Sequence, residues 1–146
     1  MSGAWRTTVV AVALAATLTG CSLVGRPDAK AWDDRAEQAL TDAVGQVRTA
    51  RLALDSARRE RTWSSYTVVL VAQAEEAMGT AQDDLSRLQV PDGRAERAER
   101  VEQLLDDAST AVEDARAAAV AGRYDDAGLR QELTDLGARL ESEAGR

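Results

Sequence analysis

Apolar residues recur along most of this chain at alternating steps of four and three positions. The longest unbroken run extends from Ala36 to Ala57, and similar runs begin at Val71, Ala98 and Leu129. Because an α-helix makes one turn every 3.6 residues, this spacing places the apolar side chains on one face of a helix. Strand-like alternation is nearly absent, so the pattern predicts an all-α protein with four amphipathic helices.

Prolines mark the start of the first helix and the turn before the third. Pro27 cannot continue a helix backward, so the first helix is expected to begin at Asp28 or Ala29. Pro91 disfavours helix at the residue before it, and Asp92 is available to cap the helix that follows. The segment around Pro91 is therefore the clearest predicted turn.

The last turn is marked by a glycine and two aspartates. Gly122 follows the third run as a helix-terminating glycine should, and Asp125 is available as the N-cap of the fourth helix. Asp126 would then lie close to the positive end of that helix dipole.

The break between the first two helices has a weaker signal, because no glycine or proline occurs between Gln46 and Met78. The segment 62–67 (Thr-Trp-Ser-Ser-Tyr-Thr) gathers weak helix formers, with Ser64 or Ser65 available as an N-cap. Without a turn there, residues 29 to 89 would form one rod of about 90 Å at about 1.5 Å per residue. A long-helix dimer is the alternative to a bundle with a turn.

These boundaries predict an antiparallel up-down four-helix bundle. Acid-before-base pairs four residues apart are expected to add local support to its helices. The predicted helices cover residues 29–61, 64–89, 92–121 and 125–144. The expected pairs are Asp55/Arg59, Asp83/Arg87, Glu96/Arg100 and Asp135/Arg139.

Small residues alternate along the predicted core face of the first helix. Every other position of its apolar run is alanine: Ala36, Ala43, Ala50 and Ala57. Small core residues allow helices to approach closely, which leaves little room for a ligand cavity. A rigid spacer or docking body is therefore favoured over a small-molecule receptor, although alanines facing alanines would instead leave a channel.

A short apolar run near the N-terminus ends at the only cysteine of the chain. Arg6 precedes an uncharged stretch over 7–18, and the sequence then reads Leu18-Thr19-Gly20-Cys21. This arrangement resembles the lipobox of bacterial prolipoproteins. The resemblance implies that diacylglycerol is attached to the thiol of Cys21 and that the chain is cut between Gly20 and Cys21.

The resemblance divides the chain into a signal peptide (1–20), a lipidated N-terminus with a short tether (21–28) and a helical domain (29–146). Two acyl chains are enough for stable membrane anchoring. An uncleaved signal anchor is the alternative, because the uncharged stretch from Thr7 to Gly25 approaches the length of a membrane-spanning helix. Both interpretations place the domain on the extracytoplasmic face of the cell membrane. The tether from residue 22 to residue 28 would span about 25 Å at most.

Composition excludes several function classes. The formal net charge is −7, which opposes binding to nucleic acid because phosphates require a basic surface. The chain has no histidine, so catalytic and metal constellations built on histidine cannot form. The acidic doublets do not have the ligand spacing of a calcium loop. We therefore expect no catalytic residues, no metal and no cofactor.

Aromatic and arginine residues gather in sequence around two of the predicted turns. An up-down bundle that starts at a lipidated N-terminus places both turns at the end farther from the membrane. Exposed aromatic and arginine clusters are typical anchors of protein interfaces. In the alternative, the aromatic side chains close the end of the core and the arginines contact helix C-termini. We name these residues the tip: Arg58, Arg59, Arg61, Trp63, Tyr66, Arg123 and Tyr124.

Trp32 lies near the opposite end of the predicted bundle. It is expected either to cap the core or to contact lipid headgroups near the anchor.

Two classes of function agree with these features. The first is a membrane-tethered, non-enzymatic adaptor or scaffold that binds an envelope protein through a bundle face or the tip. The second is a ligand-binding or sensory accessory bundle of a membrane system, with a cavity between its helices. Self-association through helical faces is a third, weaker alternative.

Overall fold

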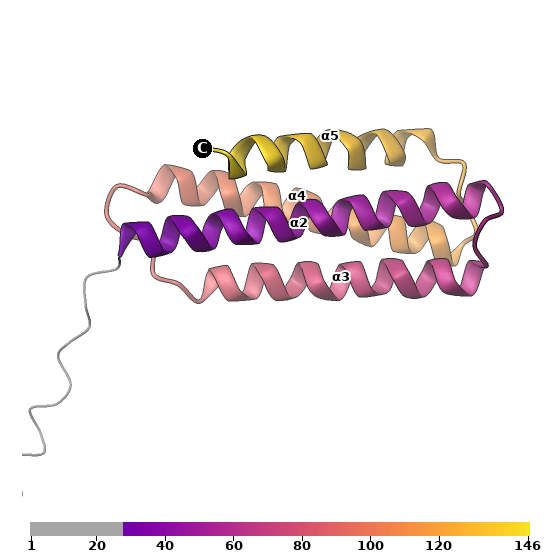
Figure 1. The fold of residues 1–146 in the computed structure, drawn as a ribbon, viewed down its shortest axis with the longest axis horizontal. Coiled ribbons are helices and arrows are strands. Elements are labelled where there is room, and N and C mark those ends of the chain that lie inside the picture. The colour runs from indigo at the N-terminus through magenta and orange to yellow at the C-terminus, as the bar shows by residue number, and fades with distance from the viewer. Residues whose placement is uncertain (1–27) are drawn as a thin grey trace, which may run out of the picture.

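The computed structural model describes residues 28–146, which fold into four α-helices without strands. Each helix runs antiparallel to the one before it (Figure 1). The predicted up-down four-helix bundle is therefore confirmed. The lipobox, the cleavage position at Gly20 and Cys21 and most of the tether lie outside the described residues. The helices are α2 (Ala29–Arg58), α3 (Ser64–Ser86), α4 (Ala95–Val120) and α5 (Ala127–Ala144).

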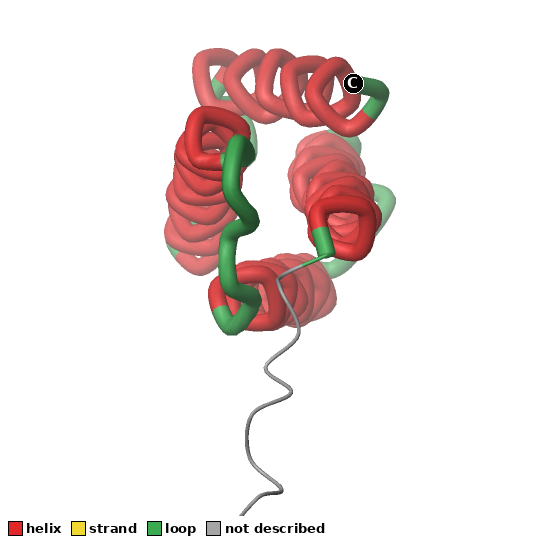
Figure 2. The backbone as a smooth tube through the Cα atoms, turned by 90° about the vertical axis from the view of Figure 1, so that its left-hand side faces the viewer, coloured by secondary structure: helices red, strands yellow, loops and turns green. Residues whose placement is uncertain are grey.

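The four helices occupy the corners of a square when the bundle is viewed along its length (Figure 2). Helix α2 contacts all three other helices, whereas α3 and α5 lie at opposite corners and do not contact each other. More than half of the buried residues of α2 and of α4 are alanine, while those of α5 include three leucines. Because small side chains permit close approach, α2 and α4 meet across the diagonal and α3 and α5 remain apart.

The interior is apolar along its length. The seven apolar positions of the predicted core face from Ala36 to Ala57 are all buried: 36, 40, 43, 47, 50, 54 and 57. Met78 of α3 and Leu140 of α5 have no exposed surface. Thr67 and Glu143 are the only buried polar residues in the part that the structure describes. The alanine-rich face of α2 is therefore closed by its neighbours and leaves no open channel.

The first two helices are separate, so the single rod from 29 to 89 is wrong. Helix α2 ends at Arg58 and α3 begins at Ser64. The chain turns back between them, and α3 packs against α2. The helix boundaries lie within three residues of those predicted from sequence.

Aspartates are the N-caps of α2 and α5. Asp28 is the N-cap of α2, and its carboxylate accepts a hydrogen bond of 3.0 Å from the Lys30 amide. The cap of α5 is Asp126 rather than Asp125, since its carboxylate accepts the Leu129 amide at 3.0 Å. The turn before α5 therefore ends one residue later than predicted.

Asp92 does not cap α4, which begins at Ala95 with Arg94 as its N-cap. The Arg94 amide donates to the Pro91 carbonyl at 3.1 Å, and Gly93 has a φ of 81°. Asp92 therefore lies within this tight turn, before α4, and not at the N-cap position of the helix. The start of α4 is therefore set by a β-turn that cap preference does not reveal.

Candidate functional site

The tip lies at the end of the bundle opposite the start of α2, on the right of Figure 1. The turn from α2 to α3 and the turn from α4 to α5 both lie there. Since α2 has 30 residues, the tip is about 45 Å from the beginning of that helix at about 1.5 Å per residue. All seven predicted tip residues belong to these two turns or to the helix ends that flank them.

The α2–α3 turn closes α2 with a residue in the left-handed region. Glu60 has a φ of 55°, and its amide donates to the Ala57 carbonyl at 2.9 Å. The Arg61 amide donates to the Ser56 carbonyl at 2.9 Å. This is the Schellman arrangement that ends many helices, with glutamate in place of the usual glycine.

The α4–α5 turn has the same geometry with glycine at the left-handed position. Gly122 has a φ of 67°, and its amide donates to the Ala119 carbonyl at 3.2 Å. The Arg123 amide donates to the Ala118 carbonyl at 2.9 Å. Arg61 and Arg123 therefore occupy equivalent positions in two similar turns at the same end of the molecule.

Helix α3 begins without a serine cap. Trp63 is the N-cap residue, whereas Ser64 and Ser65 lie in the first helical turn, so the predicted serine cap is wrong. The Thr67 hydroxyl is buried and contacts the Trp63 carbonyl and the Thr62 hydroxyl, each at 3.2 Å. These contacts hold the backbone of Trp63 and leave its indole side chain free.

Two of the three tip aromatics project into solvent. Trp63 is 85% exposed and Tyr66 is 56% exposed. Tyr124 is half-buried against the core, and its hydroxyl donates to the Ala119 carbonyl at 3.4 Å. The alternative in which the aromatics close the end of the core therefore holds for Tyr124 and is wrong for Trp63 and Tyr66.

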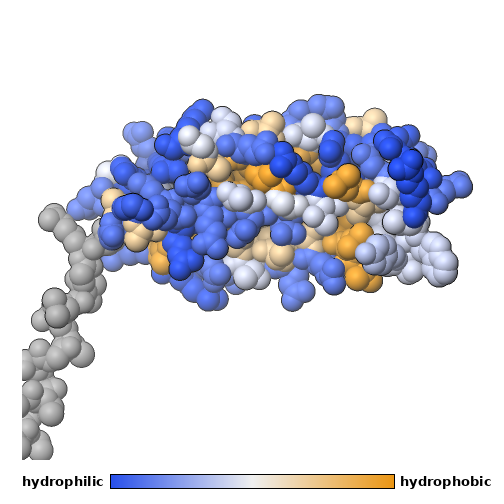
Figure 3. All heavy atoms as spheres, viewed as in Figure 1, coloured by the Kyte–Doolittle hydropathy of each residue, from blue (hydrophilic) through white to orange (hydrophobic). Residues whose placement is uncertain are grey.

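Sequence reasoning missed two apolar residues near the tip. Val69 is 50% exposed on α3 and Val120 is 65% exposed at the end of α4. Orange and pale spheres gather toward the tip end of α3 (Figure 3). Both valines lie outside the four-three spacing of the core face, and that departure is the signal that could have identified them.

The tip arginines have no side-chain partners among the residues that the structure describes. Arg58, Arg59, Arg61 and Arg123 form no side-chain hydrogen bond or ion pair with any other residue of 28–146. Arg51 is the only other arginine of that region without one. The predicted pair Asp55/Arg59 does not form. Asp55 pairs with Arg130 instead, whose Nε lies 3.4 Å from Asp55 Oδ1. These four guanidinium groups are exposed and available to another molecule.

At the opposite end, arginines are held by carboxylates. Arg94 donates to Asp33 through Nε at 2.9 Å and through Nη2 at 2.8 Å, and Arg97 Nη1 donates to the same carboxylate at 2.8 Å. The hydrogen bonds from Arg94 hold the pKa of Asp33 below its usual range. Trp32, next to Asp33, is 4% exposed and caps the core.

A second carboxylate extends this arrangement to the end of α5. Glu143 is 5% exposed, and its Oε2 accepts from Arg146 at 3.3 Å. Its Oε1 lies 4.0 Å from Arg97 Nε and 3.9 Å from Arg100 Nε. The charges of α2, α4 and α5 thus meet at the end where α2 begins, and they connect the helices.

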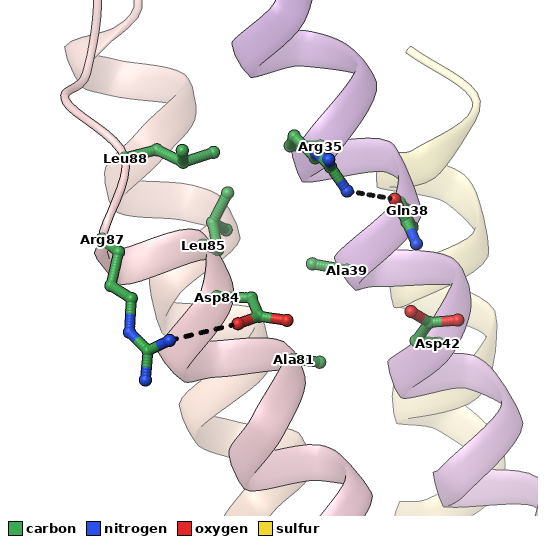
Figure 4. A pocket seen from close by; sticks show the side chains of 9 residues that line it. All are labelled: Arg35, Gln38, Ala39, Asp42, Ala81, Asp84, Leu85, Arg87 and Leu88. Carbon is green, nitrogen blue, oxygen red and sulfur yellow. Dashed lines mark hydrogen bonds and ion pairs between the residues drawn. The ribbon is translucent and has the colours of Figure 1, made fainter.

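A groove between α2 and α3 offers a small-molecule alternative. Its volume is about 360 Å³, and Arg35, Asp42, Asp84 and Arg87 contribute its charges (Figure 4). Arg35 donates to Gln38 at 3.0 Å, and Arg87, the residue after α3, lies 3.6 Å from Asp84. The groove therefore carries mixed charges, of which Asp84 and Arg87 pair with each other.

Residues 28–146 show no features of a membrane span or of a metal site. No helix there is both long enough and apolar enough to cross a membrane. No three histidine, cysteine, aspartate or glutamate side chains in the same region gather as they would to hold a metal ion.

Comparison with known proteins gives no relative: no family model, no curated protein and no solved structure matches the chain.

Proposed function

We propose that this protein is an extracytoplasmic lipoprotein, tethered to the cell membrane through diacylglycerol on Cys21. It acts as a non-enzymatic helical adaptor that presents its tip to an envelope protein. The lipobox resemblance supports the tether, and the exposed tip supports the adaptor. The observation that carries the proposal is the 85% exposure of Trp63 in a bundle whose other described tryptophan, Trp32, is buried.

Covering the exposed indole of Trp63 with a partner would remove apolar surface from water, which favours binding. Trp, Tyr and Arg are the residue types that most often dominate binding energy at protein interfaces. In this protein, these residue types lie on two hydrogen-bonded turns at one end of the bundle. Such preorganisation lowers the entropy lost on binding.

The bundle interior favours an adaptor over a receptor. In residues 28–146 the core is lined by apolar side chains, with Thr67 and Glu143 as its buried polar residues. Ligand sites are usually concave and combine apolar walls with a few converging polar groups. The groove between α2 and α3 has charges of both signs along its walls, so the ligand-binding alternative has less support.

The tether is tested by metabolic labelling with a fatty acid. The wild-type protein should incorporate the label and move to the membrane fraction, whereas Cys21→Ala should do neither. Ser22→Ala serves as a matched control and should be labelled normally. Equal labelling of Cys21→Ala and wild type would contradict the lipoprotein assignment.

The adaptor is tested by photo-crosslinking in intact cells. A photoreactive amino acid at Ser65, beside Trp63, should give one discrete protein adduct. The same amino acid at Thr80, which is exposed on the same helix about 22 Å away at about 1.5 Å per residue, should not. Trp63→Ala should abolish the adduct from Ser65, and an adduct unchanged by that substitution would contradict docking through the tip.

A further inference from the structure

The unpaired arginines of this bundle are concentrated at one end. In residues 28–146 the arginines along the body and near the start of α2 contact side chains of other residues, with Arg51 as the exception. Within the same residues, the four at the tip form no side-chain hydrogen bond or ion pair. A chain with a formal net charge of −7 has carboxylates in excess, so shortage of partners does not explain the difference.

We propose that the tip binds an acidic segment of a protein, whose carboxylates pair with Arg58, Arg59, Arg61 and Arg123 while its apolar residues cover Trp63 and Tyr66. The inference rests on the proposed adaptor function and names the chemistry of its partner. Guanidinium groups match carboxylates in bidentate geometry, and an adjacent aromatic surface excludes water from such pairs.

The pattern of charge at the tip selects a protein segment over a dense polyanion. Glu60 is exposed between Arg59 and Arg61 in the sequence, and Asp125 is exposed two residues after Arg123. They would repel a polymer that carries a phosphate at every unit, but separate carboxylates can reach individual guanidinium groups. The like charge of the tip arginines also opposes binding of a second copy tip to tip. Copies anchored in one membrane would in addition hold their tips at the same distance from it, side by side rather than end to end.

Binding of defined peptides tests the chemistry. The full chain, purified in detergent micelles, is presented to synthetic 12-residue peptides with the same apolar residues and increasing numbers of Asp and Glu, or of Asn and Gln. Binding should rise with carboxylate number and weaken with salt. Replacing all four tip arginines by glutamine should weaken binding of the acidic peptides at least tenfold, and replacing them by lysine should weaken it less.

Arg51→Gln is the matched control, because Arg51 also lacks a side-chain partner in the described region but lies two turns before the tip. It should leave peptide binding unchanged. Equal binding of acidic and neutral peptides, or undiminished binding by the fourfold glutamine variant, would overturn the inference. Circular dichroism of each variant verifies that the helices are intact.

The crosslink from Ser65 separates this inference from the adaptor proposal. If the adduct is lost in Trp63→Ala and in the fourfold glutamine variant, and the crosslinked segment is rich in Asp and Glu, both stand. If it is lost in Trp63→Ala but kept in the glutamine variant, the adaptor stands and the acidic partner is wrong. A lipid or cell-wall polymer in the adduct would overturn the acidic protein, and absence of any adduct would overturn both.

Discussion

Trp32 and Trp63 lie at opposite ends of the same bundle and have opposite surroundings. Where α2 begins, Trp32 is 4% exposed, and nearby arginines hold the carboxylates of Asp33 and Glu143. At the tip, Trp63 is 85% exposed, and four arginines have no side-chain partner within residues 28–146. The same residue types therefore stabilise the fold at one end and stay available at the other.

The difference follows from how the helices meet. Near the start of α2, side chains of α2, α4 and α5 converge on shared carboxylates, so burial and pairing reinforce each other. At the tip, each turn satisfies its own backbone carbonyls and Tyr124 covers part of the core. The side chains of Trp63 and the tip arginines do not contribute to closing the core or the turns. They are therefore available for binding another molecule.

The largest expected effect separates the two tryptophans. Trp32→Ala should lower the free energy of unfolding by about 3–5 kcal/mol, because it removes a large buried side chain and leaves a cavity. Trp63→Ala should change it by less than about 0.5 kcal/mol, as for other exposed positions. Equilibrium urea denaturation followed by circular dichroism measures both. Similar losses for the two variants would break the comparison.

Asp33→Asn should have the next largest effect. It removes the charge that holds Arg94 and Arg97, and hydrogen bonds to charged groups contribute about 1.5–3 kcal/mol each when partly buried. We expect a loss of about 2 kcal/mol in the free energy of unfolding. Asp125→Asn at the exposed tip is the control and should cost less than about 0.5 kcal/mol. Equal losses would show that the Asp33 contacts contribute no stability.

The Asp33 contribution should also depend on pH. Its pKa is lowered in the folded protein by hydrogen bonds from Arg94, so the contribution is complete above the unfolded pKa of about 3.9. It is lost as the pH falls through the lower, folded pKa. The difference in unfolding free energy between wild type and Asp33→Asn should therefore be constant from about pH 7 to about pH 5 and shrink below about pH 4. A difference that grows on acidification would contradict this assignment.

The smallest effects distinguish the two turns of the tip. Gly122→Ala should lower the free energy of unfolding by about 1 kcal/mol, because an alanine side chain disfavours the left-handed backbone. Glu60→Gly should raise it by about 0.5 kcal/mol, the balance between relieved strain and the greater entropy of glycine when unfolded. Thermal denaturation should show melting temperatures that move in opposite directions. Melting temperatures that move in the same direction would mean that the two turns differ in more than the residue at the left-handed position.

The helices and their core faces were predictable because their signals are local. The spacing from Ala36 to Ala57 identified buried positions that the structure confirms. The break after α2 had only a weak signal, since the left-handed position is held by Glu60 rather than by glycine. The sequence placed the tip residues at two turns. It left open whether their aromatic rings would be exposed or would close the end of the core.

Local charge patterns predicted little of the actual pairing. Asp83 and Arg87 approach to 4.0 Å on one helix, as expected. Arg139 instead pairs with Asp107 of α4 at 3.1 Å, and Asp55 pairs with Arg130 of α5 at 3.4 Å. A partner on a neighbouring helix competes with one four residues away, and its position cannot be read from either helix alone.

The sequence by itself determined the four amphipathic helices, the apolar face of each and the approximate place of every turn, because periodicity and turn chemistry act over a few residues. Only the tertiary structure decided that Trp32 is buried and Trp63 exposed, and that, within residues 28–146, one set of arginines is paired while the other has no side-chain partner. Those outcomes depend on which helices meet at each end of the bundle. They are set by packing between residues that are far apart in the chain.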